Sequence, residues 1–265
     1  MTRASLFRAA LAKPPALGTW IKIPAMEVVE LVALAGFDFV VIDLEHSPVD
    51  LETAYRLIGT ALHTGVSPIV RVPGRDQGLI QRVLDSGADG IMVPHVDTPE
   101  QAREVATAVR FPPRGTRGVG STSRAGQWGA LPRAEYLRYG QEEVVVIAQI
   151  ESAEGVRNAG AIAATDGIDA LLVGAADLSV SEGRADVADL VADVVDAARA
   201  AHVPVGNAGG ATADAVRYAV DTGFTFTLLS NDGSLLGAAA RAAVQAGRSV
   251  ADPGAAASTT RRTDA

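Results

Sequence analysis

Short apolar runs alternate along the chain with longer segments whose apolar residues recur at helical spacing. Most of the short runs contain few polar positions, as FVVID, VVVIAQI and ALLVG show. Apolar runs without polar alternation are typical of parallel strands that are buried on both faces. We predict strands at Thr19–Ile21, Phe39–Asp43, Pro68–Val72, Gly90–Val93, Val144–Ile150, Ala170–Gly174, Pro204–Gly206 and Phe226–Leu229.

The longer segments between these runs predict amphipathic helices. Asp50 precedes one of them and Thr98-Pro99 opens another, as expected of helix N-termini. Gly36, Gly87 and Gly223 follow the ends of others, where a glycine commonly terminates a helix. The predicted helices are Ala25–Ala35, Leu51–Thr64, Gln77–Ser86, Pro99–Arg110, Ala153–Ala164, Val187–Ala201, Thr212–Asp221 and Ser234–Ala246.

Eight strands that are each followed by a helix predict an α/β protein with one closed (β/α)₈ TIM barrel over residues 19–237. A doubly wound sheet is the alternative, but no GxGxxG motif follows the first strand. We expect a single domain over residues 1–250 and a disordered, small and polar tail over 251–265. The connection from Phe111 to Glu143 is too long for a turn, so we expect an ordered excursion that covers a site or a subunit contact.

Composition narrows the class of protein. Of 265 residues, 48% are hydrophobic and 20% are charged, which is a globular composition. The net charge of -8 disfavours a nucleic-acid-binding surface. The chain has no cysteine, which excludes disulfides and thiolate metal sites. Neither a signal-peptide core nor a stretch of about 18 apolar residues is present, so we expect a cytoplasmic protein without a membrane partner.

The polar residues that follow the strands are the candidates for chemistry, because function in a barrel gathers at the carboxyl ends of the strands. Glu151 and Asp177 follow neighbouring predicted strands, so their carboxylates should lie close together. Two carboxylates suit a hard divalent cation such as Mg²⁺, Mn²⁺ or Co²⁺. The alternative is that each acid only caps the helix that follows it, and position alone does not decide between the two.

Histidine and arginine at the same rim suggest acid–base chemistry on an anion. His46 lies three residues after Asp43, whose carboxylate could orient the imidazole as a general base. A structural histidine buried in a loop is the alternative, and His95 is a second-rank candidate. Arg71 suits a carboxylate or a developing oxyanion, or else an ion pair with a rim acid.

These residues lie within motifs that resemble one known family. GFDFVVIDLEHSPVD (36–50), RVPG (71–74), LDSGADGIMVPHVDTPEQAR (84–103), FPPRGTRGVG (111–120), AQIES (148–152) and GIDALLVGAADLS (167–179) are similar to the HpcH/HpaI family. These are metal-dependent class II pyruvate aldolases, such as 4-hydroxy-2-oxoheptanedioate aldolase. The resemblance runs from about Gly18 to Leu236 and keeps the order of the motifs.

The resemblance implies a phosphoenolpyruvate/pyruvate-type barrel whose last helix is swapped between subunits of a dimer-based homo-oligomer, a hexamer. It implies an aldehyde-lyase that cleaves a 4-hydroxy-2-oxo acid to pyruvate and an aldehyde through a metal-bound enolate. Its partners are then a small-molecule 2-oxo acid and an aldehyde. The roles carried over are metal ligands (Glu151, Asp177), catalytic residues (His46, Asp43, Arg71, and Asp85 given to a neighbouring subunit) and substrate-binding residues (Trp20, Gln149, Gly174, Ala175, Ala176).

Some positions depart from the family's pattern. Ala175 stands where a proline is usual, Leu172 where an aromatic is common, and Gly206-Asn207-Ala208 where relatives often carry larger aliphatics. We expect these changes to loosen the carboxylate-binding turn and to make the acceptor end roomier or more polar. Lysine is scarce, and none lies in ALLVG, where a Schiff-base aldolase would commonly need one.

Two other functions remain open. One is an oxaloacetate decarboxylase or a macrophomate-synthase-like enzyme that forms a carbon–carbon bond from the same pyruvate enolate. The other is a non-catalytic barrel or a relative of the CoA lyases, although no nucleotide-binding feature supports the latter.

Overall fold

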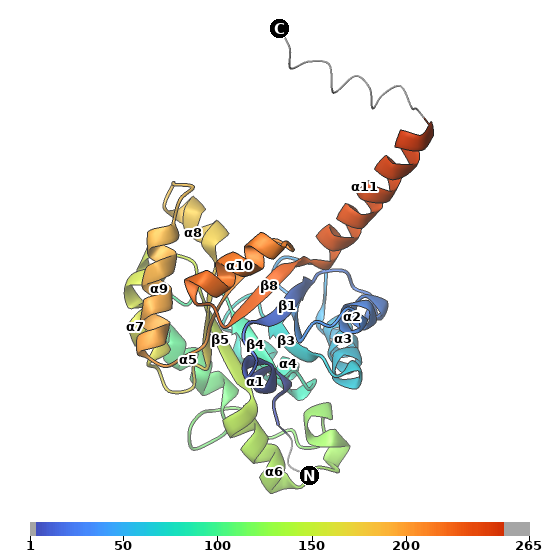
Figure 1. The fold of residues 1–265 in the computed structure, drawn as a ribbon. Coiled ribbons are helices and arrows are strands. Elements are labelled where there is room, and N and C mark those ends of the chain that lie inside the picture. Colours follow the sequence, from blue (N-terminus) through green and yellow to red (C-terminus); the bar gives the residue numbers. More distant parts are fainter. Residues whose placement is uncertain (1–3, 252–265) are drawn as a thin grey trace.

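The eight predicted strands form a closed parallel barrel in the computed structural model, which describes residues 4–251 (Figure 1). Each strand pairs with its neighbours in sequence, and β1 pairs with β8. The prediction of a (β/α)₈ barrel is therefore confirmed. The strands are β1 (Ala16–Ile21), β2 (Phe39–Asp43), β3 (Ser67–Arg71), β4 (Gly90–Val93), β5 (Val145–Ile150), β6 (Ala170–Val173), β7 (Val205–Gly209) and β8 (Phe226–Asn231).

Alternate residues on each strand enter two separate cores. Phe39 and Val41 of β2 point into the barrel, whereas Val40 and Ile42 join the layer between the strands and the helices. This is the period of two that a strand imposes. Both faces of the sheet are apolar because both are covered, which explains the bare runs in the sequence.

The predicted helices are all present, and all but the last agree with the predicted bounds to within one residue. Asp50 and Thr98 cap α3 and α5 as expected, and Thr98 forms a capping box with Gln101. The prediction missed α1, α6 and α8, and it began α11 too late and ended it too early. The helices are α1 (Leu6–Leu11), α2 (Met26–Leu34), α3 (Leu51–Thr64), α4 (Gln77–Asp85), α5 (Pro99–Val109), α6 (Arg133–Arg138), α7 (Ala153–Ala163), α8 (Ala175–Ser181), α9 (Ala188–Ala200), α10 (Ala213–Thr222) and α11 (Asp232–Ala251).

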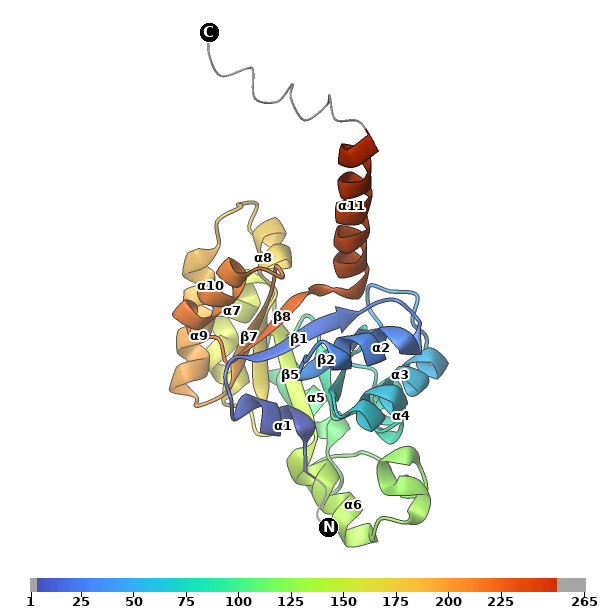
Figure 2. The same ribbon diagram turned by 45° about the vertical axis from the view of Figure 1, so that its right-hand side comes forward.

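Helix α1 closes the end of the barrel where the strands begin (Figure 2). The ring of Phe7 packs edge-on against Phe39 and Phe226, with ring centroids 5.0 and 5.4 Å apart. The buried carboxylate of Asp89 accepts hydrogen bonds at 2.8 Å from the Ser5 hydroxyl and the Phe7 N–H, which fixes the helix to the barrel. Helix α1 therefore covers this mouth of the barrel.

The long connection between α5 and β5 is ordered, as predicted. It contains a 3₁₀ turn, η1 (Arg124–Gly129), then α6 and a π turn, η2 (Tyr139–Glu143). Phe111, Leu131 and Tyr136 give it a small apolar core of its own. It lies at the end of the molecule opposite α11, so it does not cover the rim of its own barrel (Figures 1 and 2).

Within residues 4–251, no helix has both the length and the apolar character that crossing a membrane requires. Nearly all of the predicted C-terminal tail, from residue 252 on, lies outside the described residues.

Candidate active site

Asp43 and Arg71 form the centre of the rim. They are partners in the β2–β3 register, and both point into the barrel. Arg71 Nε and Nη2 donate to Asp43 Oδ1 and Oδ2 at 2.9 and 2.7 Å, a bidentate pair that is almost wholly buried. The guanidinium also lies over the ring of Trp20, 4.2 Å from its centroid. The arginine is therefore held rigidly, with one face covered by the tryptophan.

The carboxylate of Asp43 collects donors from several directions. Lys22 Nζ lies 3.2 Å from Oδ2, and the backbone N–H groups of Glu45 and His46 donate to Oδ1. Burial alone would raise the pKa of Asp43, but the hydrogen bonds and charge of Arg71, with His46 N–H and Lys22, hold that pKa below its ordinary value. Asp43 therefore holds Arg71 and the backbone of His46. The predicted hydrogen bond from the His46 imidazole to Asp43 is replaced by these contacts.

Glu45 connects the remaining rim groups, although its role was not predicted. Its Oε2 lies 3.1 Å from Arg71 Nη1 and 3.7 Å from His46 Nε2, and its Oε1 lies 3.9 Å from His95 Nε2. The imidazole of His46 is 60% exposed, so it can reach a bound molecule. A signal for Glu45 existed in the sequence, because it lies between Asp43 and His46 at a strand end.

Glu151 occupies the other side of the rim. His95 contacts Glu151 Oε1 through its backbone N–H and through Nδ1, each at 2.9 Å, and Gln149 Nε2 donates to Oε2. Burial is the main cause that raises the pKa of Glu151, and the charge of Asp177 raises it further against the effect of His95. Asp177 is exposed and lies in the first turn of α8. The two predicted metal ligands therefore lie close enough for the charge of Asp177 to act on Glu151.

The donor set fits a hard divalent cation. No group of three or more histidine, cysteine or acidic side chains suited to a metal occurs in the described part of the chain, so the carboxylate pair would need oxygen ligands from water or substrate. One further oxygen nearby, Gln149 Oε1, is buried without a hydrogen-bond partner in the described structure. A buried acceptor without a donor is costly, which is consistent with a rim built to receive a ligand.

The substrate-binding candidates surround this pair. Gln149 and Gly174 face the barrel interior, and a Cβ on Gly174 would lie 2.8 Å from the Cβ of Glu151, so only glycine fits here. Ala175 and Ala176 begin α8, whose first N–H groups have no side-chain cap. A carboxylate could accept hydrogen bonds from them.

The departures from the family's pattern at strand β7 do not enlarge the barrel interior as expected. The ring of Phe226 occupies the space beside Gly206, where a Cβ would be only 2.2 Å from a ring carbon. Asn207 points away from the barrel into the helix layer, where it lines a cavity with Val173 and Phe224. The expectation of a roomier acceptor end is wrong at these two positions.

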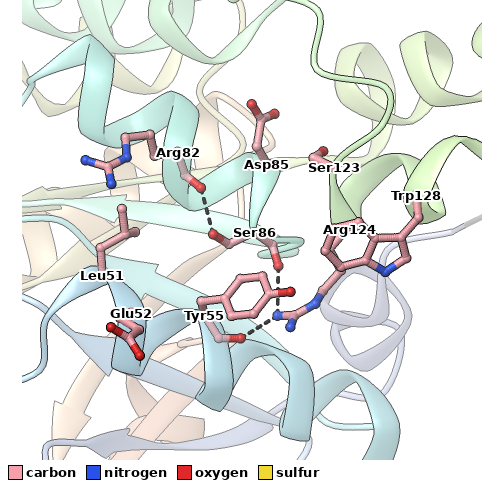
Figure 3. A pocket seen from close by; sticks show the side chains of 9 residues that line it. All are labelled: Leu51, Glu52, Tyr55, Arg82, Asp85, Ser86, Ser123, Arg124 and Trp128. Atoms are coloured by element: carbon pink, nitrogen blue, oxygen red, sulfur yellow. Dashed lines mark hydrogen bonds between the residues drawn. The ribbon is translucent and has the colours of Figure 1, made fainter.

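Asp85 lies outside this site. It ends α4, at the sealed end of the barrel, and accepts a hydrogen bond from the buried Arg117 at 2.8 Å. It lines a surface pocket with Trp128 and Tyr55, where Arg124 stacks on the tyrosine ring (Figure 3). Its carboxylate therefore cannot serve the rim of its own subunit.

Comparison with known proteins identifies the family from which these rim residues come. Residues 17–241 match the model of the HpcH/HpaI aldolase/citrate lyase family. The chain belongs to this family.

A hydroxypyruvate/pyruvate aldolase of Chromohalobacter salexigens is 39% identical over 88% of this chain and 94% of its own. The crystal structure of an HpcH/HpaI family protein from Burkholderia cenocepacia is 36% identical, with a TM-score of 0.86 over 92% of this chain and all of that one. Macrophomate synthase superposes with a TM-score of 0.81 at 27% identity, over 95% of this chain and 91% of its own. The HpcH/HpaI chain described here is accordingly an enzyme of the carbon–carbon lyase class.

Proposed function

We propose that this HpcH/HpaI protein is a divalent-metal-dependent pyruvate aldolase. It cleaves a 4-hydroxy-2-oxo acid reversibly to pyruvate and an aldehyde. The observation that carries the proposal is the placement of Glu151 and Asp177 after the neighbouring strands β5 and β6, on the rim that also presents Arg71 and His46. The name of the C. salexigens relative supports pyruvate as the product.

Glu151 and Asp177 would hold the cation. When bound there, Mg²⁺, Mn²⁺ or Co²⁺ supplies Lewis-acid stabilisation of the negative charge that develops on the 2-oxo group. The N–H groups of Ala175 and Ala176 would orient the substrate carboxylate, and Gln149 and Trp20 would border it.

Arg71 and His46 would carry the proton and charge movements. His46 takes the proton of the C4 hydroxyl, directly or through a water, as the C3–C4 bond breaks and the aldehyde leaves. The electron pair passes into the C2–C3 bond and onto the C2 oxygen, which gives the enolate of pyruvate. Arg71, fixed by Asp43, donates to that oxygen, and a proton delivered to C3 then completes pyruvate.

A second candidate uses the same enolate. Oxaloacetate would lose CO₂ to give it, and the enolate would be protonated or would attack another acceptor. The similarity to macrophomate synthase favours this alternative.

Purified protein incubated with Mn²⁺, pyruvate and either glycolaldehyde or succinic semialdehyde should give an aldol product, and EDTA should abolish it. A parallel incubation with oxaloacetate alone measures decarboxylation. The aldolase proposal requires the larger kcat/KM for aldol chemistry. Decarboxylation without any aldol product would establish the alternative instead.

The oligomer is part of the proposal. Helix α11 projects away from the barrel (Figures 1 and 2), and an apolar groove at its base is lined by Leu31 and Leu236, which are 65% and 64% exposed. We infer that α11 of a second copy covers this face in a swapped, dimer-based hexamer, which also brings Asp85 to a neighbour's rim. Light scattering should give six subunits, and a chain shortened after Asn231 should not assemble.

A further inference from the structure

A cavity of about 250 Å³ lies on the outer side of the barrel wall, beside the ends of β6 and β7. Val173 and Asn207 are register partners there, and both point toward the helices. Val191 of α9 and Tyr218 of α10 form the opposite side, with Phe224. The strands thus separate this cavity from the rim that carries Arg71 and Glu151.

The amide of Asn207 is the unusual group in the cavity. Asn207 is 8% exposed, and its Oδ1 is buried without a hydrogen-bond partner among the described residues. The position lies in an apolar layer that Val205 and Val173 share. A buried amide without a partner costs free energy, and native structures seldom retain one without a use.

The remaining walls are apolar and open. Ala175, Ala215 and Gly210 contribute little side-chain volume, while the rings of Tyr218 and Phe224 lie 6.5 Å apart, centroid to centroid. None of the described residues lining the cavity carries a carboxylate, ammonium or guanidinium group. An apolar cavity of roughly 150 Å³ is enough for benzene, so this space accommodates a single substituted ring.

We propose that this cavity binds a small neutral molecule with one ring-sized apolar body and one hydroxyl group. The hydroxyl donates to the Oδ1 of Asn207, which lacks a donor among the described residues, and the ring packs between Val191 and the aromatic pair. The absence of charge excludes the 2-oxo acid substrate, whose carboxylate would be buried without a partner.

The cavity also contacts the turn that carries a proposed metal ligand. Ala175 lines it and follows Gly174, which packs against Glu151, and Asp177 lies in the same short helix. A molecule bound here changes the space available to this turn. Occupancy therefore alters the affinity for the cation, a regulatory effect that rests on the metal-dependent function proposed above.

Benzyl alcohol and toluene test the binding site in metal-free protein by ligand-observed NMR titration. We expect saturable binding of benzyl alcohol, with toluene about fivefold weaker, the factor that one neutral hydrogen bond contributes. Ala215→Leu fills the cavity and should abolish binding, while Ala213→Leu, on the exposed side of the same helix, should bind as the parent does. Asn207→Leu should remove the preference for the alcohol.

Absence of saturable binding, or equal binding by Ala215→Leu and the parent, overturns the site. Equal affinity for the two probes in the parent overturns the role of Asn207, and this comparison needs no variant. The regulatory step is read by titrating Mn²⁺, followed by its EPR signal, with and without saturating benzyl alcohol. A changed Mn²⁺ affinity supports it and an unchanged one refutes it, whereas a parent that binds no Mn²⁺ refutes the proposed function and leaves the binding result standing.

Discussion

Asp43 and Arg71 stand opposite each other on neighbouring parallel strands, and their side chains meet inside the barrel in a bidentate ion pair. The register of β2 against β3 determines this pairing. The arginine is thereby fixed at the rim with its charge balanced, and it needs no rearrangement to meet a developing oxyanion.

Asp43→Asn should lower the free energy of unfolding at neutral pH by about 3 kcal/mol, because the buried Arg71 guanidinium loses its bidentate counterion and keeps only Glu45. The pKa of Asp43 is held below its ordinary 3.8, so the stabilisation is present above that pH and is lost as the pH falls through the lower, folded value. Urea unfolding of parent and variant across this range measures the difference. It should be constant from neutral pH to about 4 and shrink below.

A matched control is Asp189→Asn, which removes an exposed pairing with Arg184 at 2.7 Å. Its effect should be much smaller, because solvent screens such pairs. A difference between parent and Asp43→Asn that does not depend on pH would contradict an ionic role for Asp43.

Glu151→Gln should make the metal-free protein more stable at neutral pH. Burial and the nearby Asp177 raise the pKa of Glu151, so the ionised carboxylate is disfavoured in the fold. The cost grows as the pH rises from the ordinary pKa of 4.5 to the raised, folded pKa and is constant above it. The same variant should bind Mn²⁺ at least about tenfold more weakly. Thermal unfolding in EDTA and Mn²⁺ titration test the two effects, and parent-like Mn²⁺ binding would remove Glu151 from the metal site.

The barrel and the rim could be predicted from sequence for a simple reason. Strands buried on both faces appear in the sequence as uninterrupted apolar runs. The first polar residues after such runs must lie at the carboxyl rim. Glu151, Asp177, His46 and Arg71 were found in this way, and the resemblance supplied their roles.

Contacts that depend on register and on side-chain direction could not be predicted. The local spacing of Asp43 and His46 favoured a contact between their side chains, but the partner strand supplied Arg71. Lys22 was counted only as one of few lysines, although it reaches Asp43 across the strands. Asn207 points toward the helices because alternate residues of β7 face opposite sides of the sheet. The predicted strand ended at Gly206, before Asn207, so this direction was missed.

Lys22→Met should retain aldol activity within about tenfold of the parent, since the lysine only neutralises Asp43 in this mechanism. Lys22 is the lysine at the rim of the described structure, so it is the residue that a Schiff-base mechanism would need. Borohydride added with pyruvate should therefore leave the mass of the parent unchanged. Covalent trapping of pyruvate on Lys22 would refute a metal-enolate mechanism.

Gly206→Ala should destabilise the barrel, because its Cβ would overlap the ring of Phe226. The expected loss is about 1–3 kcal/mol, measured by urea unfolding. The double variant Gly206→Ala/Phe226→Leu should lose less stability than the two single variants lose together, because the smaller side chain at position 226 makes room for the new methyl group. Additive losses would show that the glycine is required for the backbone alone.

Changing each rim histidine to asparagine should have different effects on metal affinity and on kcat. Asparagine is chosen because it also tolerates the positive φ of 52° at His95. His95 contacts Glu151, so His95→Asn should weaken Mn²⁺ binding about 10- to 100-fold while saturating metal restores much of kcat. His46 contacts neither proposed metal ligand in the described structure, and His46→Asn should leave Mn²⁺ affinity unchanged but lower kcat by about 10²–10⁴. Both imidazoles are more than half exposed, so neither change should alter the unfolding midpoint much. If His46→Asn lost metal affinity and His95→Asn lost only kcat, the proton-transfer role would belong to His95.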